Sequence, residues 1–164
     1  MNINKFTQKS LQAVQDCEKM AYEYGHQELV PEHLLYSLLT TEDSLIEKLF
    51  EKMEISPEVF LAQLNGLLNK RPKVSGGQVY VGNDLNKVLI YAEDEAKHMG
   101  DSYVSVEHLF LALLDTATEK EAIPENENVS ATDTLSTYLA DLASRIALFV
   151  AAFIAILLIW FLIS

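Results

Sequence analysis

The segments EHLLYSLL (residues 32–39) and EHLFLALL (residues 107–114) are identical at five of eight positions. The distance in sequence between Glu32 and Glu107 is called the repeat offset below. When the chain is shifted by this offset, residues 6–39 align with residues 81–114, and 8 of 34 positions are identical. A long repeat with only two copies is typical of a duplicated domain with pseudo-twofold symmetry, whereas a solenoid stacks many shorter copies. This repeat therefore predicts a fold made of two related halves.

Both halves, at about residues 1–70 and 80–115, read as consecutive helices. Apolar side chains recur at spacings of three and four residues, as on one face of an α-helix. Gly25 and Gly100 follow two of these runs, where a glycine commonly ends a helix, and the Ser-Pro pair at 56–57 is typical of a helix start. The runs predict an all-α fold with helices at about 11–24, 31–39, 45–53, 57–68, 85–99 and 106–114, and their expected inward residues include Leu45, Val59 and Met99.

The charge balance restricts the classes of partner. The chain has 24 acidic and 12 basic residues, a formal net charge of -12. Nucleic-acid binding needs clustered Lys and Arg, so a nucleic-acid partner is not expected. The single cysteine, Cys17, cannot form an internal disulfide and is expected to be buried on an apolar helix face. The opening residues lack an apolar leader segment, so we expect the helical domain to stay in the cytoplasm.

No motif predicts an enzyme, a cofactor or a metal site. The string GQVYVGND (residues 77–84) has the glycine spacing of a phosphate-binding loop, but Asn83 and Asp84 stand where Lys and Ser/Thr are required. The adjacent pairs Glu32–His33 and Glu107–His108 point about 100° apart on a helix, so neither pair is expected to hold a metal. We therefore expect no catalytic residue and no bound cofactor.

The C-terminal segment differs from the rest of the chain. Residues 146–163 contain no charged, amide or hydroxyl side chain. A helix of that length spans about 27 Å, close to the thickness of a bilayer core. Arg145 precedes this run, as the positive-inside rule expects on the cytoplasmic side. The sequence thus predicts a single-pass C-terminal membrane anchor with the N-terminal domain in the cytoplasm; the alternative is an apolar end that arose by chance.

The region before the anchor is predicted to contain a linker and the start of a long helix. Residues 116–133 are polar and contain Pro124, which favours a linker. Residues 134–164 are expected to form a juxtamembrane and transmembrane helix. Small residues recur every four positions on it and would let two copies approach closely in lipid, which would allow a homodimer. These membrane-packing candidates are Ala143, Ala147, Ala151 and Ala155.

Four stretches carry a family resemblance: NKFTQKSLQAVQDCEKMAYEYG (4–25), PEHLLYSLL (31–39), KVSGGQVYVGNDLNKVLIYAEDEAK (73–97) and GDSYVSVEHLFLALL (100–114). They resemble the N-terminal repeat domain of the Clp family of AAA+ chaperones, most closely the ClpB type in bacteria. The resemblance covers about residues 1–115 and implies two four-helix repeats. Because the predicted linker stands where the family has two further helices, the second repeat is expected to be truncated. The ATPase rings of the family have no counterpart in the sequence.

The resemblance also implies candidate site residues. In ClpB-type domains, polypeptide lies in an apolar groove whose polar rim corresponds here to Thr7, Asp101 and Glu107. Acids on such a rim would prefer cationic, apolar segments. The alternative without a ligand-binding role is that Thr7 caps the first helix and Asp101 is solvated in a loop.

The repeated acids Glu32 and Glu107 raise a further alternative. In Gram-positive relatives, glutamates at these positions help to hold phosphorylated arginine. Those relatives carry a small polar residue before each glutamate, where this chain has Pro31 and Val106. The plainer interpretation is that the glutamates favour the positive helix N-termini.

The expected function is therefore non-enzymatic protein binding. The resemblance implies unfolded polypeptide, an adaptor protein or a Clp-family chaperone as the partner. The predicted anchor would hold the domain at the cytoplasmic face of a lipid bilayer. The alternative is a truncated remnant of a ClpB-type gene without a function of its own.

Overall fold

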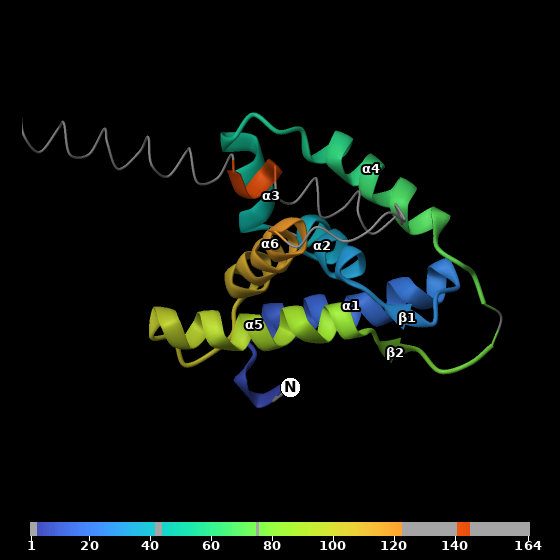
Figure 1. Ribbon diagram of the computed structural model, residues 1–164, viewed down its shortest axis with the longest axis horizontal. Coiled ribbons are helices and arrows are strands. Elements are labelled where there is room, and N and C mark those ends of the chain that lie inside the picture. The colour runs from blue at the N-terminus through green and yellow to red at the C-terminus, as the bar shows by residue number, and fades with distance from the viewer. Residues whose placement is uncertain (1–2, 42–43, 75, 123–140, 145–164) are drawn as a thin grey trace, which may run out of the picture.

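The computed structural model describes residues 3–41, 44–74, 76–122 and 141–144 (Figure 1). The described chain begins with a short 3-10 turn at Ile3–Lys5. The elements that follow are α1 (Gln8–Tyr24), β1 (Glu28–Leu29), α2 (Pro31–Thr40), α3 (Leu45–Lys52), α4 (Pro57–Lys70), β2 (Tyr80–Val81), α5 (Asn83–Met99) and α6 (Val106–Ala122). The helical prediction is confirmed for these residues.

The ends of the helices follow from local chemistry. Thr7 caps α1, and its side chain accepts a hydrogen bond from the backbone N–H of Ser10. Helices α1 and α5 both end at a glycine in the left-handed region, Gly25 (φ 74) and Gly100 (φ 78). Ser56 caps α4, with Pro57 as the first helical residue. The sequence predicted these starts and stops correctly.

Two short parallel strand contacts, which the all-α prediction did not include, join the two halves. Leu29 in β1 pairs with Val81 in β2, and Phe6 pairs with Val104 in an isolated bridge. The repeat offset separates Phe6 from Val81, and it also separates Leu29 from Val104. Each half therefore extends its N-terminal segment to the other half, and the two exchanges are equivalent in the sequence repeat.

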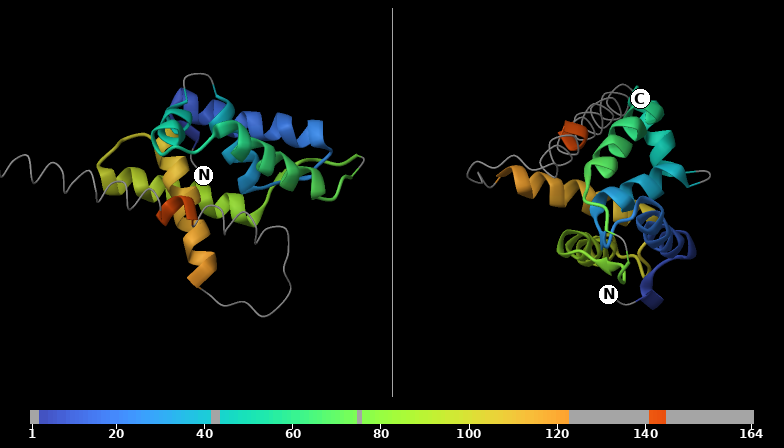
Figure 2. Two further views of the ribbon diagram at one scale, coloured as in Figure 1. Left: turned by 90° about the horizontal axis from the view of Figure 1, so that it is seen from above. Right: turned by 90° about the vertical axis from the view of Figure 1, so that its right-hand side faces the viewer.

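The two EHL helices, α2 and α6, lie at the centre of the molecule. Helix α2 packs against α1 and α6 packs against α5, while α2 and α6 also contact each other. Helices α3 and α4 lie on one side of this pair, with α1 and α5 on the other (Figure 2). Phe50 of α3 reaches into the core, where its ring lies 5.1 Å from that of Phe60 and 6.3 Å from that of Phe110. The repeated apolar sequence thus forms the core of the domain.

The second repeat was predicted to end at about residue 115, but the last described helix does not end there. Helix α6 continues to Ala122, into the predicted linker 116–133. Farther along, residues 141–144 are helical, and Leu142 is buried in the hydrophobic core. The repeat offset relates Leu142 to Leu67 of α4, which is also buried. The chain beyond residue 115 therefore contributes to the core, and the second repeat extends further than the sequence predicted.

Three residues expected to face inward are exposed: Leu45, Val59 and Met99. Leu45 is the first residue of α3 and Met99 the last of α5. Since a helix end has fewer neighbours than its middle, a regular apolar spacing does not guarantee burial there. Val59 borders a cavity of about 310 Å³ between the start of α4 and Leu142.

Among the described helices, none is both long and apolar enough to cross a bilayer. The predicted span 146–163 and the candidates Ala147, Ala151 and Ala155 lie outside the described residues. Ala143 is described, and it packs partly buried against the core. The membrane anchor and its helix packing therefore stay predictions.

Candidate functional site

Residues near the start of the described chain meet the loop between α5 and α6. The backbone N–H of Thr7 donates to the carbonyl of Val104 over 2.9 Å, and the N–H of Val104 donates to the carbonyl of Lys5 over 2.6 Å. The buried hydroxyl of Ser10 donates to the same Val104 carbonyl over 2.6 Å. These bonds place Thr7 next to the loop that precedes α6, although the two segments are far apart in the sequence.

Thr7 caps α1, as one of the two interpretations of the sequence predicted. Its Oγ1 accepts from the backbone N–H of Ser10 over 3.2 Å and lies 2.9 Å from the Ser10 hydroxyl. The residue is only half-buried. A capping threonine at the surface can also contact a ligand, so the cap leaves the rim role open.

Asp101 and Glu107 flank the same loop. Asp101 follows the left-handed Gly100, and its N–H donates to the carbonyl of Ala96 over 2.8 Å. Its side chain is 58% exposed, and its Oδ2 lies 3.2 Å from Nε2 of His108. Glu107 is half-buried in the first turn of α6. Both carboxylates thus stand within a few residues of Val104, which binds the Thr7 segment.

Two exposed apolar side chains belong to the same region. Met99 is 55% exposed and Tyr103 is 58% exposed, and they stand on either side of Asp101 in the chain. The apolar spacing predicted that Met99 faces inward, and no pattern in the sequence selected Tyr103. The only sequence feature that could have indicated an exposed apolar side chain here was a tyrosine in a loop between two helices. The segment 99–107 therefore carries both apolar and anionic groups.

The ring of His108 joins the loop to α6. The backbone N–H of Ser105 donates to Nδ1 of His108 over 2.9 Å. Because Nδ1 accepts this bond, the neutral ring carries its proton on Nε2, which lies 3.2 Å from Oδ2 of Asp101. His108 itself is only 3% exposed. The ring therefore caps the helix with one nitrogen and holds a surface carboxylate with the other.

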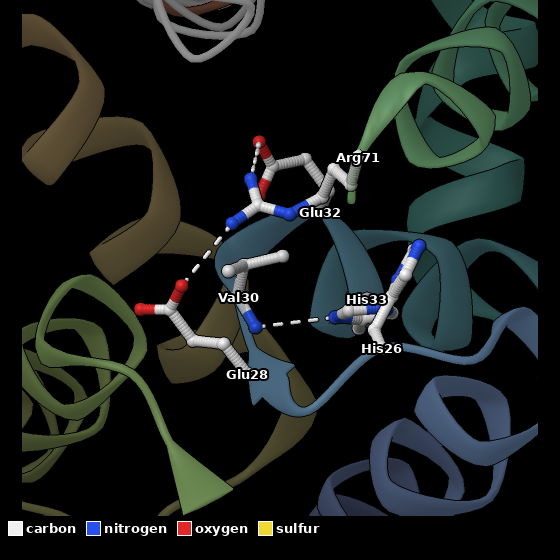
Figure 3. A network of polar contacts seen from close by, with 6 residues as sticks. All are labelled: His26, Glu28, Val30, Glu32, His33 and Arg71. Atoms are coloured by element: carbon white, nitrogen blue, oxygen red, sulfur yellow. Dashed lines mark hydrogen bonds and ion pairs between the residues drawn. The ribbon is translucent and has the colours of Figure 1, made fainter. Parts of the chain in front are cut away.

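The first half contains the same capping contact with a different partner (Figure 3). The backbone N–H of Val30 donates to Nδ1 of His33 over 3.1 Å. The other ring nitrogen, Nε2, lies 2.9 Å from Nδ1 of His26. The repeat offset relates His26 to Asp101, as it relates His33 to His108. Burial first, and then the charges of His26 and Arg71, lower the pKa of His33 to about 4.

Glu32 is neutralised within the protein. It is buried in the first turn of α2, and its Oε1 lies 3.7 Å from Nη1 of Arg71. The same guanidinium bonds Glu28 over 3.3 Å (Figure 3). Glu107, the matching acid of the second half, has no ion pair among the described residues. The two repeated acids are therefore not equivalent, because only Glu32 is paired with an arginine among the described residues.

No group of three or more potential metal ligands occurs in the described part of the chain. The described helices also leave Cys17 buried, and burial raises the pKa of its thiol to about 12. Neither feature offers a site for chemistry. The surface around Asp101 and Glu107 can bind a cationic group, but its described residues include no nucleophile positioned beside a base.

Comparison with known sequences identifies the family of the chain. The family described as Clp repeat (R) N-terminal domain matches residues 5–123. Chaperone protein ClpB of Nitratidesulfovibrio vulgaris is 44% identical over 120 residues, which cover 70% of this chain and 14% of that protein. ClpB of Porphyromonas gingivalis is 39% identical over 123 residues, covering 75% of this chain and 14% of that protein. The chain thus spans about one seventh of the length of the curated relatives it matches.

Solved structures share the fold at lower identity. The Hsp104 N-terminal domain from Candida albicans superposes with a TM-score of 0.65 at 23% identity, covering 86% of this chain and 93% of that one. The N-terminal domain of the ClpV1 ATPase from E. coli has a TM-score of 0.65 at 18% identity, covering 87% of this chain and 85% of that one.

Proposed function

The chain belongs to the family of Clp repeat (R) N-terminal domains, and we propose that it is a non-catalytic module that binds polypeptide at the surface around Thr7, Asp101 and Glu107. Unfolded protein is the proposed ligand, and an adaptor protein or a Clp-family chaperone would dock through the same kind of contact. The observation that carries the proposal is that Glu107 has no ion pair among the described residues, whereas Arg71 pairs with its counterpart Glu32. Glu107 follows the exposed Asp101 by six residues in the chain.

The chemistry of the surface favours one class of polypeptide. Two carboxylates attract cationic side chains, and a carboxylate accepts a guanidinium through two hydrogen bonds. Met99 and Tyr103 add exposed apolar area beside them. Segments that combine Arg or Lys with large apolar residues are exposed mainly in unfolded chains, since folding buries the apolar part. The surface therefore suits unfolded cationic, apolar segments better than folded acidic proteins.

The membrane location is a separate proposal that rests on the sequence. Residues 146–163 are apolar over a length that spans a bilayer core. They would hold the domain at the cytoplasmic face, close to its α3–α4 side, because Leu142 is seated beside the start of α4. Ala143 packs against the core, so a homodimer through the tail would use Ala147, Ala151 and Ala155. Retention in the membrane pellet after an alkaline wash supports this location, and release into the supernatant contradicts it.

Binding can be measured with two labelled peptides. The cationic peptide is rich in Arg and Leu with glycine spacers, and the anionic peptide has Glu in place of Arg. The full chain is titrated in non-ionic detergent, with empty micelles as the blank, and fluorescence anisotropy reports binding. We expect the cationic peptide to bind and the anionic peptide to bind much more weakly. Equal affinities, or no binding of either peptide, would overturn the proposal.

Variants locate the binding surface. Glu107→Gln removes one of the two carboxylates and should weaken binding of the cationic peptide about tenfold, since a charge-assisted contact contributes about that much. Glu51→Gln is the matched control, because it removes the same charge from an exposed position on α3. If both variants weaken binding equally, the effect comes from net charge and not from this surface.

A further inference from the structure

We propose that His108 is a positioning residue that holds the Asp101 carboxylate in place for a cationic ligand and that makes the second half of the domain the binding half. This inference rests on the proposed function and assigns a role to a residue that does not itself touch the ligand. The juxtaposition that carries it is a buried imidazole nitrogen 3.2 Å from an exposed carboxylate oxygen.

The first step is the fixed state of the His108 ring. Its Nδ1 receives the backbone N–H of Ser105 over 2.9 Å, with the Ser105 hydroxyl 3.0 Å away. A nitrogen that accepts an N–H bond carries no proton of its own in the neutral ring. The proton of neutral His108 is therefore on Nε2, where it can be donated to Asp101. The helix cap thus selects the tautomer that can hold the carboxylate.

The second step is the geometry of the carboxylate. Nε2 of His108 lies 3.2 Å from Oδ2 of Asp101, and no contact to Oδ1 is found among the described residues. The backbone beneath is also held, because the N–H of Asp101 donates to the carbonyl of Ala96 over 2.8 Å. A surface aspartate without such contacts would rotate freely and would lose that freedom on binding a ligand. The contact with a buried ring removes this cost beforehand and leaves one oxygen for the ligand.

The two halves share the capping bond to the histidine ring but differ in the second contact of that ring. The capping bond to Nδ1 is present in both, from Val30 to His33 and from Ser105 to His108. The partner of Nε2 differs, since it is His26 in the first half and Asp101 in the second. The capping role therefore does not require a carboxylate. The acid at position 101 is an addition specific to the second half.

The charges around the two rings point the same way. In the first half, Arg71 lies against Glu28 and Glu32. In the second half, the exposed carboxylate of Asp101 contacts His108, and the half-buried Glu107 directly precedes His108 in the chain. A cationic ligand would meet acids that already share an arginine at the first half, and acids without an arginine among the described residues at the second. The asymmetry makes one site per chain, although the fold is duplicated.

The chain offers a matched set of variants. His108→Asn keeps an acceptor at the position of Nδ1 for the Ser105 N–H, but its side chain is too short to reach Asp101. His108→Gln can accept the cap bond, as a glutamine at this helix position commonly does, and can still donate to Asp101. His33→Asn makes the same change in the first half, where the lost partner is His26. Thermal unfolding identifies the temperature at which all variants are folded.

Anisotropy titrations with the cationic peptide, on the full chain in non-ionic detergent, test the role. We expect His108→Asn to bind about three- to tenfold more weakly than the wild type, because the Asp101 side chain must then be immobilised on binding. His108→Gln should recover most of the affinity, and His33→Asn should bind like the wild type. In an Asp101→Asn background, His108→Asn should have no further effect, because the two residues act as one unit.

Two results would overturn the inference while leaving the proposed function intact. One is that the wild type binds the peptide and His108→Asn binds it equally well. The other is that His108→Asn weakens binding by the same factor with and without Asp101→Asn, which would mean that His108 acts only on the fold. If the wild type does not bind the peptide, the proposed function fails, and this inference fails with it.

Discussion

Acidification should destabilise the domain through His33, whose ring is fully buried between α2 and the loop after α1. Its pKa in the folded protein is lowered from 6.5 to about 4, first by burial and then by the nearby His26 and Arg71. The unfolded chain therefore binds the proton more tightly than the folded protein does. Stability is complete above about pH 6.5 and is lost as the pH falls toward 4.

The magnitude follows from the difference between the two pKa values. Each pKa unit corresponds to about 1.4 kcal/mol, so lowering the pKa of His33 from 6.5 to about 4 predicts a loss of about 3 kcal/mol in the free energy of unfolding over that pH range. The protonated ring would also lose the bond from the Val30 N–H to Nδ1. The cap of α2 should therefore weaken at the same pH as the domain.

Urea unfolding followed by far-UV circular dichroism measures this loss. The wild type and His33→Gln are compared at about pH 7.5, 5.5 and 4.5, each relative to its own value at the highest pH. Exposed carboxylates titrate in both proteins and cancel in the comparison. The wild type should lose about 2.5 kcal/mol more than the variant by about pH 4.5. Parallel pH profiles for the two proteins would refute the assignment of the effect to His33.

Three further predictions concern packing. Leu142 is buried, so Leu142→Ala should lower the free energy of unfolding by about 2 kcal/mol or more. Ser144→Ala, at an exposed neighbouring position, should change it little. Equal effects of the two variants would mean that residues 141–144 do not support the core. A Cβ at Gly82 would lie 2.8 Å from the carbonyl oxygen of Leu29, so Gly82→Ala should destabilise the domain in urea unfolding. Gly66 lies within α4 with open space around it, so Gly66→Ala should stabilise the domain by about 0.5–1 kcal/mol. The reverse order of stabilities would contradict the β1–β2 packing. Cys17 should react with a thiol reagent only in urea, because burial raises its pKa to about 12; rapid labelling of the folded chain would contradict its burial.

Much of the fold was accessible from the sequence because its signals are local. The starts and stops at Ser56 and Gly25 depend on a side chain or a backbone angle within one helical turn. The repeat offset also predicted the relation between α2 and α6. The two-residue strands were not predicted, since a pair such as Leu29 and Val81 forms only after the halves have packed.

The error at residue 115 has a physical reason. The segment that follows is polar but rich in good helix formers, and it contains no glycine or proline before Pro124. A helix can therefore continue until the residues just before the proline, where α6 ends at Ala122. Polarity and Pro124 together predict a linker, whereas polarity is equally typical of an exposed helix.

The candidate site was accessible only in part. The resemblance selected Thr7, Asp101 and Glu107, and their common position around Val104 is a property of the fold. The contact between His108 and Asp101 could not be predicted, because it joins a helix to the preceding loop through side-chain geometry. The difference between Glu107 and Glu32 was also hidden, since Arg71 lies on another helix end.

The central claim, that polypeptide binds around Thr7, Asp101 and Glu107, is tested most directly by mapping a ligand onto the folded chain. Backbone amide spectra of the isotope-labelled full chain are recorded in detergent while unlabelled cationic peptide is added. The account predicts saturable shifts at Thr7 and across residues 99–108, with little change around Glu32 and Arg71. Shifts centred on the first half, or none at saturating peptide, would contradict it.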